Sequence, residues 1–194
     1  EISPVEEISV FDLKVHMSSD PKSKDFSGYA GIIFGIGGRE VDHRIRSIVH
    51  DKPARDGGLL AVVEPDGRVC FRDFYTGGGG SSWSIGGPLK EGQVLPVPGQ
   101  EFSGNPVGET VENVAAWNIR LTLSPQANGT FNASLTSYLL NSEEVVCSAI
   151  LKGLVASQID GSFGLLSHLG DASSPHLGWG FDQFKVSGSA LASF

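Results

Sequence analysis

The stretch GLLAVVEPDGRVCFRDF (residues 58–74) decides the fold class. Two runs rich in Val, Leu and Phe flank the tetrapeptide Glu64-Pro65-Asp66-Gly67. Proline presets φ at one turn position and glycine accepts a positive φ at another, so this pattern is typical of a tight β-hairpin. The stretch therefore predicts two antiparallel strands joined by a turn at 64–67.

Alternating apolar and polar residues continue this pattern along the chain. Residues 11–17 place four apolar side chains on one strand face, namely Phe11, Leu13, Val15 and Met17. Further strands are expected over 29–37, over 117–139 as a second hairpin with its turn at 126–129, over 162–168 and over 179–188. Because tryptophans in strands mostly face the core, Trp117 and Trp179 are expected there.

One segment, 142–154, fits two structures. Its apolar residues match a helical stripe and an alternating strand equally well. We favour a strand, because the segment is short and its flanks alternate.

Length and composition support one all-β domain over residues 1–194. This length suits a single large β-sandwich. Hydrophobic residues make up 40%, enough for a core, whereas charged residues make up 19%, below the roughly 25% usual for soluble domains. The 26 glycines indicate short strands with many tight turns.

The charge balance excludes some partners. The formal net charge is −8 and no block of Lys or Arg occurs, so the surface would repel nucleic-acid phosphates. It suits a bound cation or a neutral sugar. No apolar run approaches the ~18 residues of a membrane span, so none is expected.

Cys70 and Cys147 are the only cysteines. Both lie in expected strands and neither belongs to a C-x-x-C motif, which disfavours redox and zinc chemistry. A disulfide between them and two free thiols both remain open.

The acidic stretch GREVDHRIRSIVH (38–50) offers a candidate catalytic strand. On a strand, one face would carry Glu40, Asp42, Arg44, Arg46 and His50. Retaining glycosidases need two carboxyls about 5–5.5 Å apart, one of them kept protonated. The adjacent arginines instead favour ionised acids. We therefore interpret the face as an ion-paired or ligand-binding surface, with Glu40 and Asp42 as catalytic candidates only.

A carbohydrate site would combine this face with aromatic side chains. Tyr75 and Trp83 bracket the glycine-rich loop 76–82. The candidate carbohydrate-binding residues are Arg44, Arg46, His50, Tyr75 and Trp83.

Two carboxyl-terminal segments carry a family resemblance. After the hairpin at 58–74 come DGSFGLLSH (160–168) and GFDQFKVSG (180–188). Their order resembles concanavalin A-like jelly rolls of the laminin G type, which implies a β-sandwich of two antiparallel sheets. The segments AGIIFGIG, RSIVHD and GGLLAVVEPDGRVCFRDF also resemble the jelly-roll region attached to bacterial alkaline-phosphatase D-type metallophosphatases.

The resemblance also implies a structural calcium ion. Alternation puts Asp182 on the core-facing side with Phe184 and Val186, where a bare carboxylate is costly. It would need backbone donors, a basic side chain or a metal. Calcium prefers oxygen ligands of this kind. The alternative is a carboxylate that bonds a neighbouring turn.

The expected function follows from the resemblance. It implies a non-catalytic module that is secreted, periplasmic or on the cell surface, and that binds carbohydrate or packs on an adjoining protein domain. Two alternatives are a glycoside hydrolase on the same fold and a purely structural accessory domain of a secreted metallophosphatase.

Overall fold

The chain folds almost entirely into strands. The computed structural model describes residues 8–18, 28–36, 59–73, 95–96, 99–104, 116–159, 161–168 and 178–188. Within these residues there are eleven strands and one short helix, α1 (Ala156–Ile159). No helix in this part of the chain is long and apolar enough to cross a membrane.

The strands form two antiparallel sheets, which confirms the predicted all-β class. The six-stranded sheet has the order β11 (Gly178–Ser187), β1 (Ser9–Ser18), β7 (Ala116–Pro125), β8 (Phe131–Leu139), β9 (Val145–Leu154) and β6 (Glu101–Gly104). The five-stranded sheet has the order β10 (Ser162–His168), β2 (Tyr29–Ile36), β3 (Leu59–Val63), β4 (Val69–Asp73) and β5 (Leu95–Pro96). The ambiguous segment 142–154 is thus mainly strand, as predicted.

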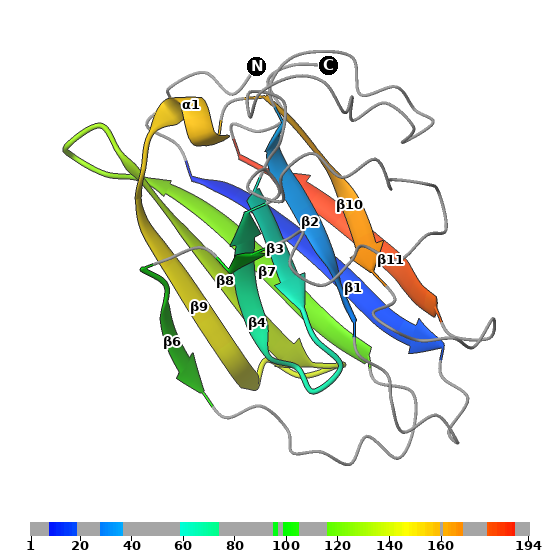
Figure 1. The fold of residues 1–194 in the computed structure, drawn as a ribbon. Helices are drawn as coiled ribbons and strands as arrows, with labels where there is room; N and C mark the ends of the chain where they lie inside the picture. Colours follow the sequence, from blue (N-terminus) through cyan, green and yellow to red (C-terminus); the bar gives the residue numbers. More distant parts are fainter. Residues whose placement is uncertain are drawn as a thin grey trace.

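The two sheets pack face to face as a β-sandwich (Figure 1). Strand β2 faces β1, β3 faces β7, and β4 faces β8 and β9. One apolar cluster joins them, with Phe11, Leu121 and Ala149 from one sheet and Ile32 and Phe71 from the other. On β1, β7 and β8 of the six-stranded sheet the core side chains alternate with polar ones, so these strands bury one face.

The central strands β2, β3 and β4 of the five-stranded sheet have buried side chains on both faces. All five residues of β3 are buried. On the face away from the six-stranded sheet, a second cluster contains Tyr29, Ile33, Leu60, Val62 and Cys70. Two-sided burial accounts for the unbroken apolar run of β3. Cys70 lies in this cluster and Cys147 in the central one, and both are free and buried.

The predicted hairpin at 58–74 is confirmed, and its turn follows from the sequence EPDGR. The N–H of Gly67 donates to the Glu64 carbonyl at 2.9 Å. Asp66 Oδ1 accepts the backbone N–H of Arg68 at 3.0 Å. Gly67 has φ of 84°, which a residue with a side chain rarely adopts. A three-residue loop that ends in such a residue is a common hairpin connection.

The second predicted hairpin, β7–β8, uses the same turn. The N–H of Gly129 donates to the Gln126 carbonyl at 2.9 Å, and Asn128 Oδ1 accepts the N–H of Thr130 at 3.1 Å. Gly129 has φ of 78°. The two turns thus share an Asp or Asn followed by Gly at matching positions.

The two turns differ in their surroundings. A Cβ atom on Gly67 would lie 3.0 Å from the Trp117 ring, whereas one on Gly129 would meet nothing within 4 Å. The Ser137 hydroxyl donates to the Gly67 carbonyl at 2.6 Å. Trp117 is 4% exposed, which confirms its predicted place in the core. The β3–β4 turn therefore packs against the other sheet, and the β7–β8 turn is open.

Gln100 lies where the chain passes from one sheet to the other. Its side-chain Oε1 accepts the Phe71 N–H at 2.8 Å, and its Nε2 donates to the Phe71 carbonyl at 2.7 Å. The next residue begins β6, which pairs with β9. The Gln100 amide thus extends the pairing of β4 beyond the two-residue strand β5.

The pair of turns provides a matched test of packing. We expect Gly67→Ala to lower the free energy of unfolding more than Gly129→Ala. Both place a side chain at positive φ, which costs ~1–2 kcal/mol. Only Gly67→Ala also presses on Trp117, adding about 1–3 kcal/mol for overpacking. Urea unfolding of both variants measures the difference, and equal losses would contradict the docked turn.

Candidate functional site

The outer face of the six-stranded sheet is polar. A cross-strand row of polar residues runs over all six strands, through Lys185, Asp12, Arg120, Thr136, Ser148 and Ser103. Because side chains alternate, burying one face of β1, β7, β8 and β9 turns their residues of this row to the outside, and β6 is exposed throughout.

A groove of about 460 Å³ crosses this face. Its lining comes from β1, β7, β8, β11 and the turn after β8: Asp12, Leu13, Lys14, Asn118, Ile119, Arg120, Tyr138, Ser142, Glu143, Gln183 and Lys185. β1, the β7–β8 hairpin and β11 are far apart in sequence, and they meet because β11, β1, β7 and β8 are neighbours in the sheet. We define this set as the outer groove.

A fixed ion pair lies within the outer groove. Arg120 Nε donates to Asp12 Oδ1 at 2.6 Å. The hydrogen bond to Asp12 raises the pKa of Arg120 above its ordinary value. The same guanidinium lies 5.9 Å from the centre of the Tyr138 ring. Asp12 and Arg120 therefore pair with each other. The amide, hydroxyl and ammonium groups of the other lining residues take no part in this ion pair.

Two unusual backbone conformations border the outer groove. Among the described residues, Asn141 (φ 60°) and Gln183 (φ 53°) are the non-glycine residues with positive φ. Asn141 precedes two groove residues, Ser142 and Glu143, and Gln183 lines the groove itself. Asparagine adopts this conformation readily, but glutamine does so at a cost of order 1 kcal/mol. A residue with a strained backbone, Gln183, thus forms part of the groove lining.

The conformation of Gln183 makes a β-bulge that overturns the predicted position of Asp182. Asp12 pairs with Lys185 and Lys14 pairs with Asp182, so β11 has one extra residue. Phe181 and Phe184 both pack on the core as a result. Asp182 points outward with its side chain 56% exposed, and lies on the opposite side from Phe184.

The Asp182 carboxylate has two contacts with neighbouring protein groups. Oδ1 accepts the backbone N–H of Gln183 at 2.8 Å, and Oδ2 lies 3.9 Å from Lys14 Nζ. The part of the chain that the structure describes contains no group of three or more His, Cys, Asp or Glu residues that could hold a metal. Calcium binding at Asp182 stays a prediction from the family resemblance.

The other predicted site residues lie outside the described residues. They are the catalytic candidates Glu40 and Asp42 and the carbohydrate-binding candidates Arg44, Arg46, His50, Tyr75 and Trp83. Trp179, expected in the core, is partly buried and packs against the central cluster.

The residues of the outer groove were not singled out from the sequence. The signal that could have found them is the polar half of each alternating strand, such as Asp12 and Lys14 between Phe11, Leu13 and Val15. Alternation gives the face, but it does not give which strands are neighbours. The grouping of Lys14, Asn118 and Tyr138 depends on the sheet order.

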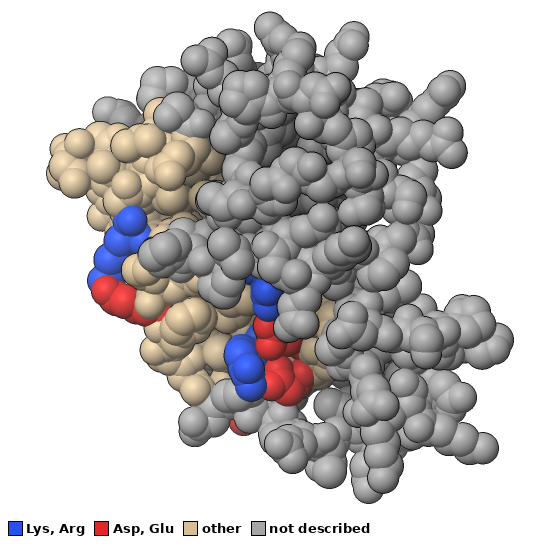
Figure 2. Space-filling model, viewed as in Figure 1, with Lys and Arg blue, Asp and Glu red and all other residues tan. Residues whose placement is uncertain are grey.

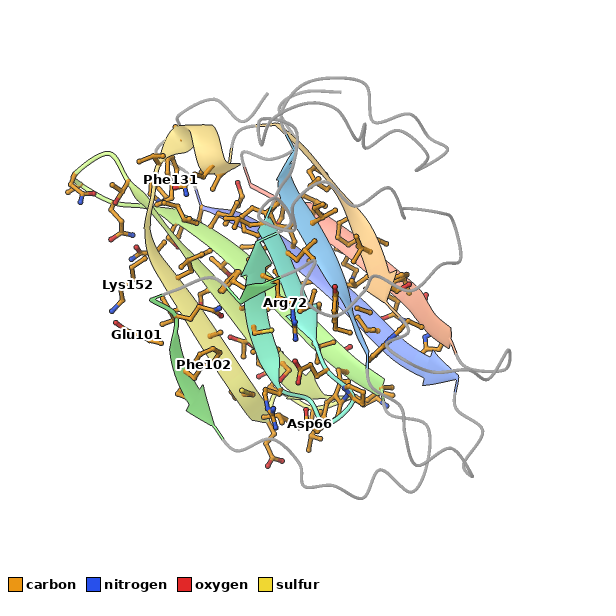
Figure 3. All side chains as sticks on the ribbon, viewed as in Figure 1. Asp66, Arg72, Glu101, Phe102, Phe131 and Lys152 are labelled. Carbon is orange, nitrogen blue, oxygen red and sulfur yellow. The ribbon has the colours of Figure 1, made fainter. Side chains whose placement is uncertain are left out.

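A second charged cluster lies on the β3–β4 hairpin. Arg72 donates to Glu64 at 2.8 Å, and its guanidinium lies 4.7 Å from the centre of the Tyr29 ring. Figure 2 shows adjoining groups of basic (blue) and acidic (red) side chains on the side of the molecule that carries this hairpin. Figure 3 shows Arg72 along β4 and Asp66 at the hairpin tip. Burial raises the pKa of the Cys70 thiol, which disfavours the reactive thiolate. Through Arg72 the cluster joins the β3–β4 hairpin to Tyr29 of β2.

No protein-family model, curated protein or solved structure matches this chain.

We expect ionisation of the Tyr29 phenol to lower the free energy of unfolding at alkaline pH. Burial raises its pKa from 10.0 to about 12, although Arg72 opposes this. A raised pKa means that the neutral phenol favours the folded state. This contribution is complete below pH 10 and is lost as the pH rises towards 12, by up to about 3 kcal/mol.

Denaturant unfolding between pH 9 and 12 measures this effect. Tyr29→Phe is the control, because it removes the ionisable group and should give a flatter profile. Absorbance at 295 nm should show one late-titrating tyrosine that this substitution removes. An identical alkaline loss in both proteins would contradict the assignment.

Proposed function

We propose that this protein is a non-catalytic carbohydrate-binding β-sandwich module whose ligand lies in the outer groove. The observation that carries the proposal is the composition of the groove. It sets amide, hydroxyl and ammonium groups around a paired Asp12 and Arg120, with one aromatic ring at Tyr138. Carbohydrate sites combine directional hydrogen-bonding groups with an aromatic face.

The row of polar residues across the six-stranded sheet supports an extended ligand. The cross-strand row through Asp12, Arg120 and Thr136 continues to Ser148 and Ser103 on the far strands. Ser103 and Ser148 share a hydrogen bond between their hydroxyls. A polymer chain lying across the strands would meet polar groups on each one. The proposed fold type is the concanavalin A-like jelly roll, in line with the sequence resemblance.

Association with an adjoining protein domain is the second candidate. Phe102 is 57% exposed on β6, at one end of the six-stranded sheet (Figure 3). Beside it, Glu101 pairs with Lys152 of β9 at 2.8 Å. An exposed aromatic residue on a terminal strand favours a protein contact.

Binding to a polysaccharide panel, measured by affinity electrophoresis and calorimetry, tests the first candidate. We expect Asn118→Ala and Tyr138→Ala to weaken binding about fivefold to tenfold each, through loss of a hydrogen bond or a ring contact. Thr122→Ala and Ser134→Ala are matched controls. They lie on the same two strands and the same face but outside the outer groove, and should leave binding unchanged.

The panel also separates the alternatives. Binding to no polysaccharide would contradict the carbohydrate proposal, as would equal losses in the control variants. Hydrolysis that disappears in Glu40→Gln or Asp42→Asn would instead support a glycoside hydrolase.

A further inference from the structure

The outer groove differs in charge from the rest of the chain. Its lining contains three basic residues, Lys14, Arg120 and Lys185, and two acidic residues, Asp12 and Glu143. The whole chain has a net charge of −8. The carboxylate of Asp182 also lies 3.9 Å from Lys14 Nζ, so the basic and acidic side chains at the groove are equal in number. The groove is therefore close to neutral on an acidic protein, and it repels an anion less than the rest of the surface does.

The three cations are not equally available. Arg120 is held by Asp12 at 2.6 Å, and Lys14 lies at the limit of ion pairing with Asp182, at 3.9 Å. Lys185 is exposed, and no carboxylate among the described residues lies within ion-pairing distance of it. Its register partner across the strands is Asp12, whose carboxylate is already bonded to Arg120. Lys185 is thus the cation that a ligand can engage without breaking an existing pair.

Stacking alone gives this groove little affinity. Among its lining residues, Tyr138 is the one aromatic side chain, and the Arg120 guanidinium already lies near its ring. A neutral polymer bound mainly by ring contacts would need several such platforms. Charge-assisted hydrogen bonds are the stronger contacts that this lining can supply.

We infer that the ligand of the outer groove is an anionic polysaccharide with carboxylates on its sugar rings, engaged by Lys185. This inference rests on the proposed carbohydrate-binding function and names its substrate class. The lining also contains the neutral polar groups of Asn118, Ser142 and Gln183, which suit ring hydroxyls, and an acidic peptide does not have such hydroxyls.

Oligogalacturonate and its fully methyl-esterified form are the matched probes, because they share the same sugar chain and differ only at the carboxyl group, which is an anion in one and a neutral methyl ester in the other. Calorimetry on the full chain should give tighter binding of the acid, by about fivefold for an exposed ion pair. The preference should shrink when salt rises from about 20 mM to about 200 mM, since salt screens exposed charges.

Variants assign the preference to the groove. Lys185→Ala should remove most of the difference between acid and ester, and Lys185→Arg should keep it. Lys152→Ala is the control, because Lys152 is an exposed lysine of the same sheet that pairs with Glu101 and does not line the groove.

The outcomes separate the inference from the proposed function. Equal binding of acid and ester, or tighter binding of the ester, would overturn the inference and leave carbohydrate binding standing. Binding of neither form nor any other polysaccharide would overturn both. Tighter binding of poly-glutamate than of oligogalacturonate would show that the groove selects an acidic peptide, and would also overturn the inference.

Discussion

The alternation of side chains between core and solvent in β1, β7 and β8 is the constraint on which the rest of the structure depends. Shifting one of these strands by a single residue would bring Arg120 or Asp12 into the core and expose Leu121 or Phe11. Burying such charges is prohibitive, so one register survives. That register also lays out the polar row on the outer face, which means that core packing and the candidate site have a common physical origin.

The β-bulge of β11 changes the phase of the alternation beside the outer groove. Without the extra residue, Phe181 and Phe184 would lie on opposite faces of the strand. With it, both pack on the core, while Asp182 turns to solvent beside Lys14. The positive φ of Gln183 is the local cost of packing both partly buried aromatic residues against the core. The same conformation places Gln183 and Lys185 along the outer groove.

Local sequence predicted the hairpins but not the site. The turns EPDGR and QANGT specify their own geometry through an Asp or Asn and a Gly, so both were predicted from a few residues. Asp182 was placed wrongly because nothing within GFDQFKVSG marks the bulge: glutamine has no special tendency towards positive φ. The outer groove depends on β11 and β1 becoming neighbours across most of the chain, a pairing between distant segments that periodicity does not encode.

Gln100 connects the two sheets of the sandwich. Its side chain belongs to the edge of one sheet while its main chain leads directly into a strand of the other. A glutamine amide offers a donor and an acceptor like those of a peptide group, so it occupies Phe71 as a neighbouring strand would. An open strand edge invites pairing with other chains. Gln100 covers the β4 edge at Phe71. Because β6 begins at the next residue, this contact is coupled to the pairing of β6 with β9. Exchange of the Phe71 amide proton thereby reports on the sheet to which Phe71 does not belong.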